Sequence, residues 1–162
     1  MSIAGLLIRD ASADDAQLLA DLTRACWSGR VAASSSGHRE TAVAVAEQLR
    51  FGGAFLLQIG DTVAASVRWL PLETESGVWE ILRMGVLPAF RGQRLSAHLL
   101  EAVLHHARLD DVGELRLAVR SDQSPLLGLY ATLGFEVAPE LDYSHANPLE
   151  PAPLVMRRLL AR

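Results

Sequence analysis

The sequence predicts an α/β (α+β) fold with a mixed, mostly antiparallel central sheet of about seven strands, flanked by about four helices. Short segments that suit β-strands occur along the whole chain. Gly60 and Asp61 mark a hairpin turn between two of these segments, and a long amphipathic segment separates two others. Hairpins pair strands antiparallel, whereas a crossover helix implies that the strands it joins are parallel.

In the first half of the chain we expect an edge strand, two helices and a hairpin. Ser12 can cap the first helix, and Gly52 and Gly53 separate the second helix from the strand that follows. A loop of small residues joins the two helices. The expected ranges are 6–12 for the strand, 12–27 and 38–50 for the helices, and 54–60 and 62–70 for the hairpin.

In the second half we expect the crossover helix, a shorter helix and the remaining strands. Leu95, Leu99 and Val103 recur at helical spacing, so the crossover helix covers the sheet with one apolar face. Pro125 suits the first position of the short helix, and Gly134 suits its end. The expected ranges are strands at 78–86, 114–121 and 154–160, a further strand from 135, and helices at 92–109 and within 122–134.

Composition and charge exclude several classes of protein. With 162 residues, half of them hydrophobic, the chain fits one packed domain over residues 1–162. A formal charge of −4 argues against a general nucleic-acid binder. The single cysteine, Cys26, excludes an intramolecular disulfide and suits a reducing compartment. No apolar stretch approaches the roughly 18 residues of a membrane span, and no secretion signal is evident, so we expect a soluble cytoplasmic protein.

The junction at residues 85–96 is the clearest candidate binding site. A strand stops before Pro88, and the chain passes through Arg91 and Gly92 into the long helix. The first N–H groups of a helix lack helical partners, so this junction suits an anion. It matches neither the phosphate loop of nucleoside-triphosphate enzymes nor the glycine pattern of dinucleotide-binding folds. An Arg-Gly turn without any ligand remains the alternative.

Residues 78–135 carry motifs that resemble those of the GCN5-related N-acetyltransferase (GNAT) superfamily. A strand ends at Val86 with Pro88 two positions on, and "LGLYATLGF" carries the family's Leu-Tyr and Gly-Phe pairs. The family's cofactor loop reads Gln or Arg, any two residues, Gly, any residue, then Gly or Ala. The matching positions are Arg91, Gly92, Gln93, Arg94, Leu95 and Ser96. The first position fits the pattern, whereas the fourth and the sixth depart from it.

The resemblance implies an acyl-CoA-dependent N-acyltransferase with acetyl-CoA as the favoured donor. An amine would attack the thioester directly in a ternary complex, with coenzyme A as co-substrate and no metal. The acceptor would be a small-molecule or peptide amine, without nucleic acid or a membrane as partner, and the chain would form a homodimer. The sheet would contain a splayed parallel central pair. The alternative is a non-catalytic module of the same fold that binds coenzyme A or a protein partner.

The resemblance also assigns cofactor contacts to a strand and to a loop beyond it. Met84, Gly85 and Val86 would pair with the pantetheine arm, and one of their main-chain N–H groups would polarise the thioester carbonyl. Gln123 stands where the family often has an asparagine that contacts the cofactor. An isolated glycine in a strand often marks a bulge, so we expect a bulge at Gly85.

Arg94 is the departure from the family pattern that needs a physical explanation. It replaces a glycine that lets phosphate approach the backbone. The main-chain N–H groups of the loop at 91–96 stay available if Arg94 adopts a helical conformation with its side chain turned outward, and the guanidinium could add a phosphate contact. Ser96 is small and obstructs little. If the Arg94 side chain instead covers the amides, the non-catalytic alternative gains weight.

Glu80 is the candidate general base. A carboxylate among apolar neighbours has its pKa raised by desolvation, which suits proton uptake near neutral pH. Glu80 also lies eleven residues before Arg91, where histone-type members of the family carry their catalytic glutamate. The alternatives are a solvated strand end or an ion pair with an arginine such as Arg68 or Arg116. By the two-residue period of a strand, Glu80 would share a face with Val78, Leu82, Met84 and Val86.

Tyr130 is the candidate acid, because the family commonly places a tyrosine there to protonate or hydrogen-bond the sulfur of coenzyme A. A phenol can donate as this role requires, and simple packing on an amphipathic helix is the alternative. His105 and His106 are adjacent and point about 100° apart on a helix, so we expect solvated side chains rather than metal ligands. Cys26 is expected to be a buried structural thiol.

Substrate recognition in the resembling fold falls mainly on the first two helices with their loop and on the segment between the last strands. In this chain these are residues 27–39 and 141–153. Asp142, Tyr143 and His145 could line an acceptor groove, and a surface loop without a role is the alternative. The sequence leaves the acceptor amine open.

Overall fold

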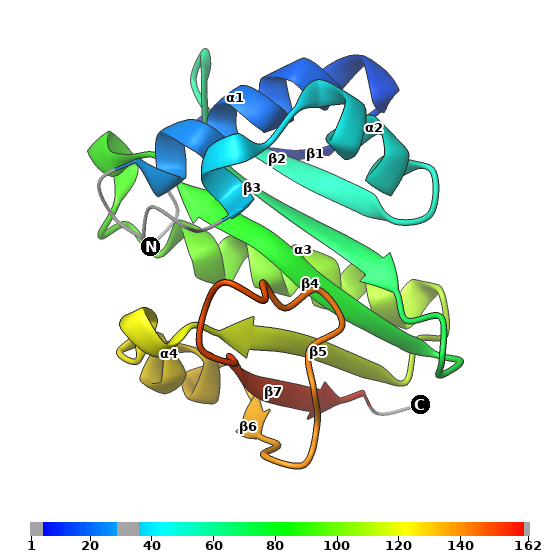
Figure 1. Ribbon diagram of the computed structural model, residues 1–162. Helices are drawn as coiled ribbons and strands as arrows, with labels where there is room; N and C mark the ends of the chain where they lie inside the picture. The colour runs from blue at the N-terminus through cyan, green and yellow to red at the C-terminus, as the bar shows by residue number, and fades with distance from the viewer. Residues whose placement is uncertain (1–4, 29–35, 161–162) are drawn as a thin grey trace.

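The computed structural model describes residues 5–28 and 36–160, which form one seven-stranded sheet with helices on both faces (Figure 1). The strand order is β1-β2-β3-β4-β5-β7-β6, and it confirms the mixed sheet predicted from the sequence. The strands are β1 (Leu6–Asp10), β2 (Gly53–Ile59), β3 (Thr62–Pro71), β4 (Val78–Val86), β5 (Glu114–Val119), β6 (Glu136–Val137) and β7 (Leu154–Leu159). The helices are α1 (Ala16–Trp27), α2 (Ala42–Leu49), α3 (Leu95–Leu109) and α4 (Leu126–Thr132), with 3-10 turns at Ala13–Asp15, Ser36–Arg39, Pro88–Phe90 and Ser121–Gln123.

Neighbouring strands pair antiparallel except β4 and β5, which are parallel. The parallel ladder joins residues 78–80 to residues 114–116 and ends there. Beyond it the two strands diverge, which is the splayed central pair that the family resemblance implied (Figure 1). The candidate site lies between these diverging ends.

The two-residue period of the strands divides the core between the two faces of the sheet. On β2, Ala54 and Leu56 pack with α1 and α2, whereas Phe55 and Leu57 pack in the cluster that includes α3. Figure 1 shows α1 and α2 on one face and α3 on the other. Within the described ranges, no helix is long and apolar enough to cross a bilayer.

A β-bulge interrupts β4 near its C-terminal end. The register with β3 shifts between the pair Gly85↔Ser66 and the pair Leu82↔Arg68. Arg83 lies in this interval and adopts a left-handed backbone with φ of 54°. The prediction of a bulge at Gly85 is therefore wrong in position, because the strained residue is Arg83.

The bulge reverses which residues of β4 face α3. Before the bulge Ile81 packs in the cluster on the α3 side, and after it Met84 and Val86 do. The prediction that every second residue of 78–86 shares one face is therefore wrong, since the extra residue shifts the alternation by one. Glu80 lies on the face opposite Ile81, where the segment between β6 and β7 crosses the sheet (Figure 1).

Two predicted helices begin later than expected. The second, α2, begins at Ala42 because Thr41 caps it, its hydroxyl accepting from the N–H of Ala44 at 3.2 Å. The long helix α3 begins at Leu95 rather than at residue 92, because Gly92 has a φ of 84° that no right-handed helix allows. The apolar stripe predicted for α3 is buried as expected and includes Leu95, Leu99, Val103 and Ala107.

Candidate active site

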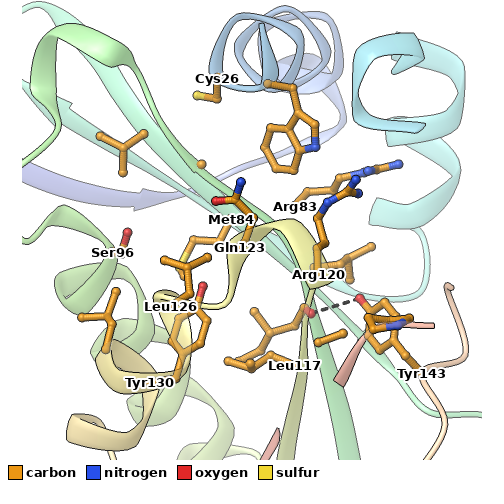
Figure 2. Close-up of a pocket in the computed structure, with 18 of the residues that line it drawn as sticks. Cys26, Arg83, Met84, Ser96, Leu117, Arg120, Gln123, Leu126, Tyr130 and Tyr143 are labelled. Atoms are coloured by element: carbon orange, nitrogen blue, oxygen red, sulfur yellow. Dashed lines mark hydrogen bonds between the residues drawn. The ribbon is translucent and has the colours of Figure 1, made fainter. Parts of the chain in front are cut away.

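A cavity of about 670 Å³ opens where β4 and β5 diverge. Its walls are the bulged end of β4, the end of β5, the first turn of α3, part of α4, and residues from the segment between β6 and β7. Figure 2 shows Met84 and Leu117 on the two strands, Ser96 on α3 and Tyr130 on α4, all around this space. The volume lies within the roughly 300–1,000 Å³ typical of small-molecule sites.

The N-terminus of α3 forms one wall of the cavity. Leu95, Ser96 and Ala97 are the first residues of the helix, and all of them line the cavity. The N–H groups of a first helical turn have no acceptors within the helix, and the helix dipole adds positive potential. This wall therefore favours an anionic group.

Arg94 precedes this first turn and has a left-handed backbone, with φ of 60° and ψ of 30°. The backbone of Arg94 is therefore left-handed, whereas the helix α3 that follows it is right-handed. Glycine adopts this conformation without steric cost, which accounts physically for the glycine of the family pattern. The Arg94 side chain is exposed at the edge of the cavity that it lines.

Not every other residue of the loop lines the cavity. Arg91 and Gly92 line it, whereas Gln93 is exposed and lies outside the lining. The guanidinium Nη2 of Arg91 donates to the main-chain oxygen of Cys26 at 2.9 Å. This hydrogen bond fastens the loop to the C-terminal end of α1, so part of the Arg91 side chain has a structural role.

Met84, Gly85 and Val86 line the cavity from β4, beyond the end of the ladder with β5. A Cβ atom at Gly85 would lie 2.8 Å from Cβ of Cys26 and 2.8 Å from Cζ3 of Trp27. Such separations are far shorter than van der Waals contact. Glycine is therefore required here by the close approach of α1.

Tyr130 and Gln123 also line the cavity. Tyr130 is 7 % exposed, and burial raises the pKa of its phenol to about 12. The phenol therefore stays protonated at neutral pH and can donate a hydrogen bond. Figure 2 shows its hydroxyl directed toward the part of the cavity where Met84 and Gln123 lie. The ring also packs edge-on against Phe135, with centroids 6.4 Å apart.

Glu80 is buried, with only 2 % of its surface exposed, and lies outside the lining of the cavity. Ser144 covers its carboxylate, the main-chain N–H donating to Oε2 at 3.1 Å and the hydroxyl donating to Oε1. Nε2 of His145 lies 3.5 Å from Oε1. The solvated strand end considered from the sequence is therefore wrong.

The two arginines considered as partners of Glu80 are held by other acids. Arg68 is 1 % exposed and forms an ion pair with Glu40. Arg116 donates to Glu75 at 2.7 and 3.0 Å and also pairs with Glu114. Glu80 is thus bound to the segment between β6 and β7.

That segment supplies two of the three polar residues predicted for an acceptor groove. Tyr143 and His145 line the cavity, whereas Asp142 is exposed outside it. The hydroxyl of Tyr143 donates to the main-chain oxygen of Ile81 at 3.2 Å, drawn as a dashed line in Figure 2, and burial raises the pKa of Tyr143. Part of the other predicted segment, residues 29–35, lies outside the described residues.

Two arginines of the lining were missed at the sequence level. Arg83 projects from the bulge, and its Nε lies 3.5 Å from the carboxylate of Glu40. Arg120 follows β5, with its guanidinium 3.2 Å from Asp122 and 3.3 Å from Glu150. Nothing in the strand pattern marks a bulge at an arginine, so this placement had no sequence signal.

The remaining candidate residues are Cys26 and the adjacent histidines His105 and His106. Cys26 is buried, and burial raises the pKa of its thiol to about 11, in keeping with the structural thiol expected. His105 is exposed as expected. His106 is only partly solvated: its side chain is 37% exposed, and its ring packs against Trp69 with centroids 5.3 Å apart.

Comparison with known proteins agrees with this geometry. Residues 17–135 match the model of the acetyltransferase (GNAT) family. Mycothiol acetyltransferase from Brachybacterium faecium is 37% identical over 59 residues, which cover 36% of this chain and 18% of that protein. The chain thus spans less than a fifth of the length of this curated relative.

Solved structures of other proteins share the fold at low sequence identity. The PaiA N-acetyltransferase from Thermoplasma acidophilum, in complex with coenzyme A, superposes with a TM-score of 0.76 at 16% identity, over 99% of this chain and 100% of that one. The ribosomal-protein-S18-alanine N-acetyltransferase from Escherichia coli gives 0.75 at 16% identity, over 97% and 95%. With the family match over most of its length, the chain belongs to the acetyltransferase (GNAT) family.

Proposed function

We propose that this chain is a single-domain, acyl-CoA-dependent N-acyltransferase that transfers an acetyl group from acetyl-CoA to a primary amine. The observation that carries the proposal is the cavity between the diverging ends of β4 and β5, one wall of which is the N-terminus of α3. This cavity offers helix amides to an anion and a length of β4 that β5 leaves unpaired. The coenzyme A complex of the Thermoplasma protein, which has the same fold, supports coenzyme A as the ligand.

The pyrophosphate is assigned to the loop and first helical turn at residues 91–96. Main-chain N–H groups supply most of this contact, and every non-proline residue carries one. The exposed Arg94 side chain also lines the cavity, so it would add a cation beside the pyrophosphate. Met84, Gly85 and Val86 would then pair with the pantetheine arm, and Gln123, which also lines the cavity, would contact the cofactor.

Tyr130 is assigned to the leaving sulfur. A phenol with a pKa of about 12 is a much weaker acid than an alkyl thiol, whose ordinary pKa is about 8.5. Full proton transfer from Tyr130 to the thiolate would therefore be uphill. A hydrogen bond from the phenol to the departing sulfur is the favoured form of assistance, and it strengthens as negative charge develops there.

Deprotonation of the attacking amine depends on Glu80. Glu80 is the acidic residue of β4 that the sequence singled out as a base. Its carboxylate lies 3.5 Å from Nε2 of His145, which lines the cavity. Replacing Glu80 with glutamine should lower turnover with little change in the affinity for acetyl-CoA. An unchanged turnover would remove Glu80 from the mechanism.

The acceptor and the assembly are proposed by analogy with the family, and the location is proposed from the single cysteine. We assign a small-molecule or peptide amine as acceptor, attacking in a ternary complex, a cytoplasmic location and a homodimer. The cavity lining includes Arg83, Arg91, Arg94 and Arg120, so the acceptor panel should include amines that also carry a carboxylate.

The test is a coupled assay of the purified chain with acetyl-CoA and a panel of amines. Release of free thiol should rise with one class of amine, and mass spectrometry should find that amine heavier by one acetyl group. Binding of acetyl-CoA without any acetylated product from amino acids, polyamines and peptides would favour the non-catalytic module. Absence of binding would refute both.

A further inference from the structure

The buried carboxylate of Glu80 is separated from the cavity by the residues that bind it. Glu80 lies at the last position of the parallel ladder, between Leu70 of β3 and Arg116 of β5. Ser144 donates two hydrogen bonds to its carboxylate, one to each oxygen. An amine bound in the cavity therefore meets His145, which lines the cavity, before it meets Glu80, which is buried outside the lining.

His145 connects Glu80 to the cavity. Its side chain is 37% exposed and belongs to the lining, while its Nε2 lies 3.5 Å from Oε1 of Glu80. The ring of Tyr143 stands edge-on to it, with centroids 5.7 Å apart, and the hydroxyl of Tyr143 is fixed to the main chain of Ile81. Residues 143–145 are thus held to β4 at consecutive positions, which restricts where the imidazole can lie.

A carboxylate beside one imidazole nitrogen selects the tautomer. The charge of Glu80 near Nε2 favours the form in which Nε2 carries the proton, and this leaves Nδ1 as the acceptor. Neutral imidazole is the commonest general base in enzymes because it accepts and returns protons near neutral pH.

We propose that His145 is the general base of the acetyl transfer and that Glu80 is a positioning residue that acts through it. As the amine nitrogen bonds to the thioester carbon, it loses one proton to Nδ1 of His145. The carbon–sulfur bond breaks, and its electron pair leaves with the sulfur, which receives the hydrogen bond of Tyr130. The imidazolium then returns its proton to the thiolate, directly or through solvent, so that amide, thiol and neutral imidazole result.

This inference rests on the proposed function and changes the role of one residue in it. The sequence pointed to Glu80 as the base itself, in direct contact or through water. The geometry assigns the direct contact to a residue more than sixty positions later, on a loop whose position no pattern in the sequence specifies.

The test compares His145→Gln with His105→Gln, an exposed histidine on α3 away from the cavity lining. With the best amine of the panel, His145→Gln should lower kcat by about 10² to 10⁴ fold, the usual contribution of a general base. The KM for acetyl-CoA and the thermal midpoint should change little, and His105→Gln should behave as wild type. Added imidazole should restore part of the turnover of His145→Ala, which it would not do if the residue only supported the loop.

The double variant separates the two roles. If Glu80 acts through His145, adding Glu80→Gln to His145→Gln should lower kcat little further, because the two side chains work as one unit. Multiplied losses, or wild-type turnover in His145→Gln, would overturn the proposal and return the role of base to Glu80.

Nitrogen NMR spectroscopy of the protein with labelled histidine tests the contact between His145 and Glu80 independently of turnover. It should find His145 protonated at Nε2 in the resting protein, and a mixed tautomer in Glu80→Gln. Protonation at Nδ1 in both proteins would overturn the proposal. If no amine were acetylated, the proposed function would fail, and this spectrum would still decide whether Glu80 positions His145.

Discussion

Replacing Arg94 with glycine should stabilise the fold, although the change removes a large side chain. Arg94 has a left-handed backbone at the start of α3, with φ of 60° and ψ of 30°. An L-residue in this conformation costs about 1–2 kcal/mol, and glycine avoids this cost. Glycine gives back about 0.5–1 kcal/mol through its greater freedom in the unfolded chain. The net gain is about 0.5–1 kcal/mol.

The matched variant is Arg94→Ala, which removes the same guanidinium but keeps the Cβ atom that causes the strain. For a chain of this size about 1 kcal/mol shifts the melting temperature by roughly 2–4 °C, so the glycine variant should melt about 1–4 °C above the alanine variant. Scanning calorimetry and urea unfolding measure the difference. Equal melting of the two variants, or higher melting of Arg94→Ala, would refute the left-handed conformation at this position.

The remaining predictions concern three buried side chains, those of Glu40, Tyr130 and Cys26. Replacing Glu40 with glutamine leaves the guanidinium of Arg68 buried without its charge partner and should lower the free energy of unfolding by about 3–5 kcal/mol in urea titrations; a loss below 1 kcal/mol would contradict a buried pair. Tyr130→Phe should slow turnover while keeping acetyl-CoA affinity, and a normal rate would reduce the tyrosine to packing. Burial raises the pKa of the Cys26 thiol from 9.0 to about 11, so the unfolded chain loses this proton first as pH rises. Stability should therefore fall between pH 9 and 11 more steeply in wild type than in Cys26→Ala, and parallel pH curves would contradict the burial of the thiol.

Local patterns in the sequence were sufficient for most of the architecture. Alternation and turn residues located the strands, and β4 has the bounds expected, Val78–Val86. The stripe that begins at Leu95 and Leu99 identified the face of α3 that is buried. These features depend on residues close together in the chain, which is why they can be read from it.

The errors arise where distant segments decide the conformation. Close packing of α1 explains Gly85, and the bulge falls instead on Arg83, a residue type without a preference for positive φ. The later start of α3 depends on two consecutive unusual conformations, at Gly92 and Arg94, of which only the glycine is visible in the sequence.

The candidate site shows the same limit. Glu80 and Tyr130 were located from their positions relative to motifs, but the cover of Glu80 by Ser144 and His145 depends on how a loop of 141–153 folds back across β4. That loop contains several prolines and no periodic pattern, so its path is set by tertiary contacts.

The central claim is that the N-terminus of α3 and the open edge of β4 bind the thioester cofactor, and calorimetric titration with acetyl-CoA tests it most directly. Free coenzyme A and adenosine monophosphate serve as comparison ligands, since the second lacks both the pyrophosphate and the pantetheine arm. The account predicts saturable one-site binding of acetyl-CoA with a micromolar Kd, about −8 kcal/mol, and much weaker binding of the nucleotide. No heat and no thermal stabilisation at millimolar acetyl-CoA would contradict the account.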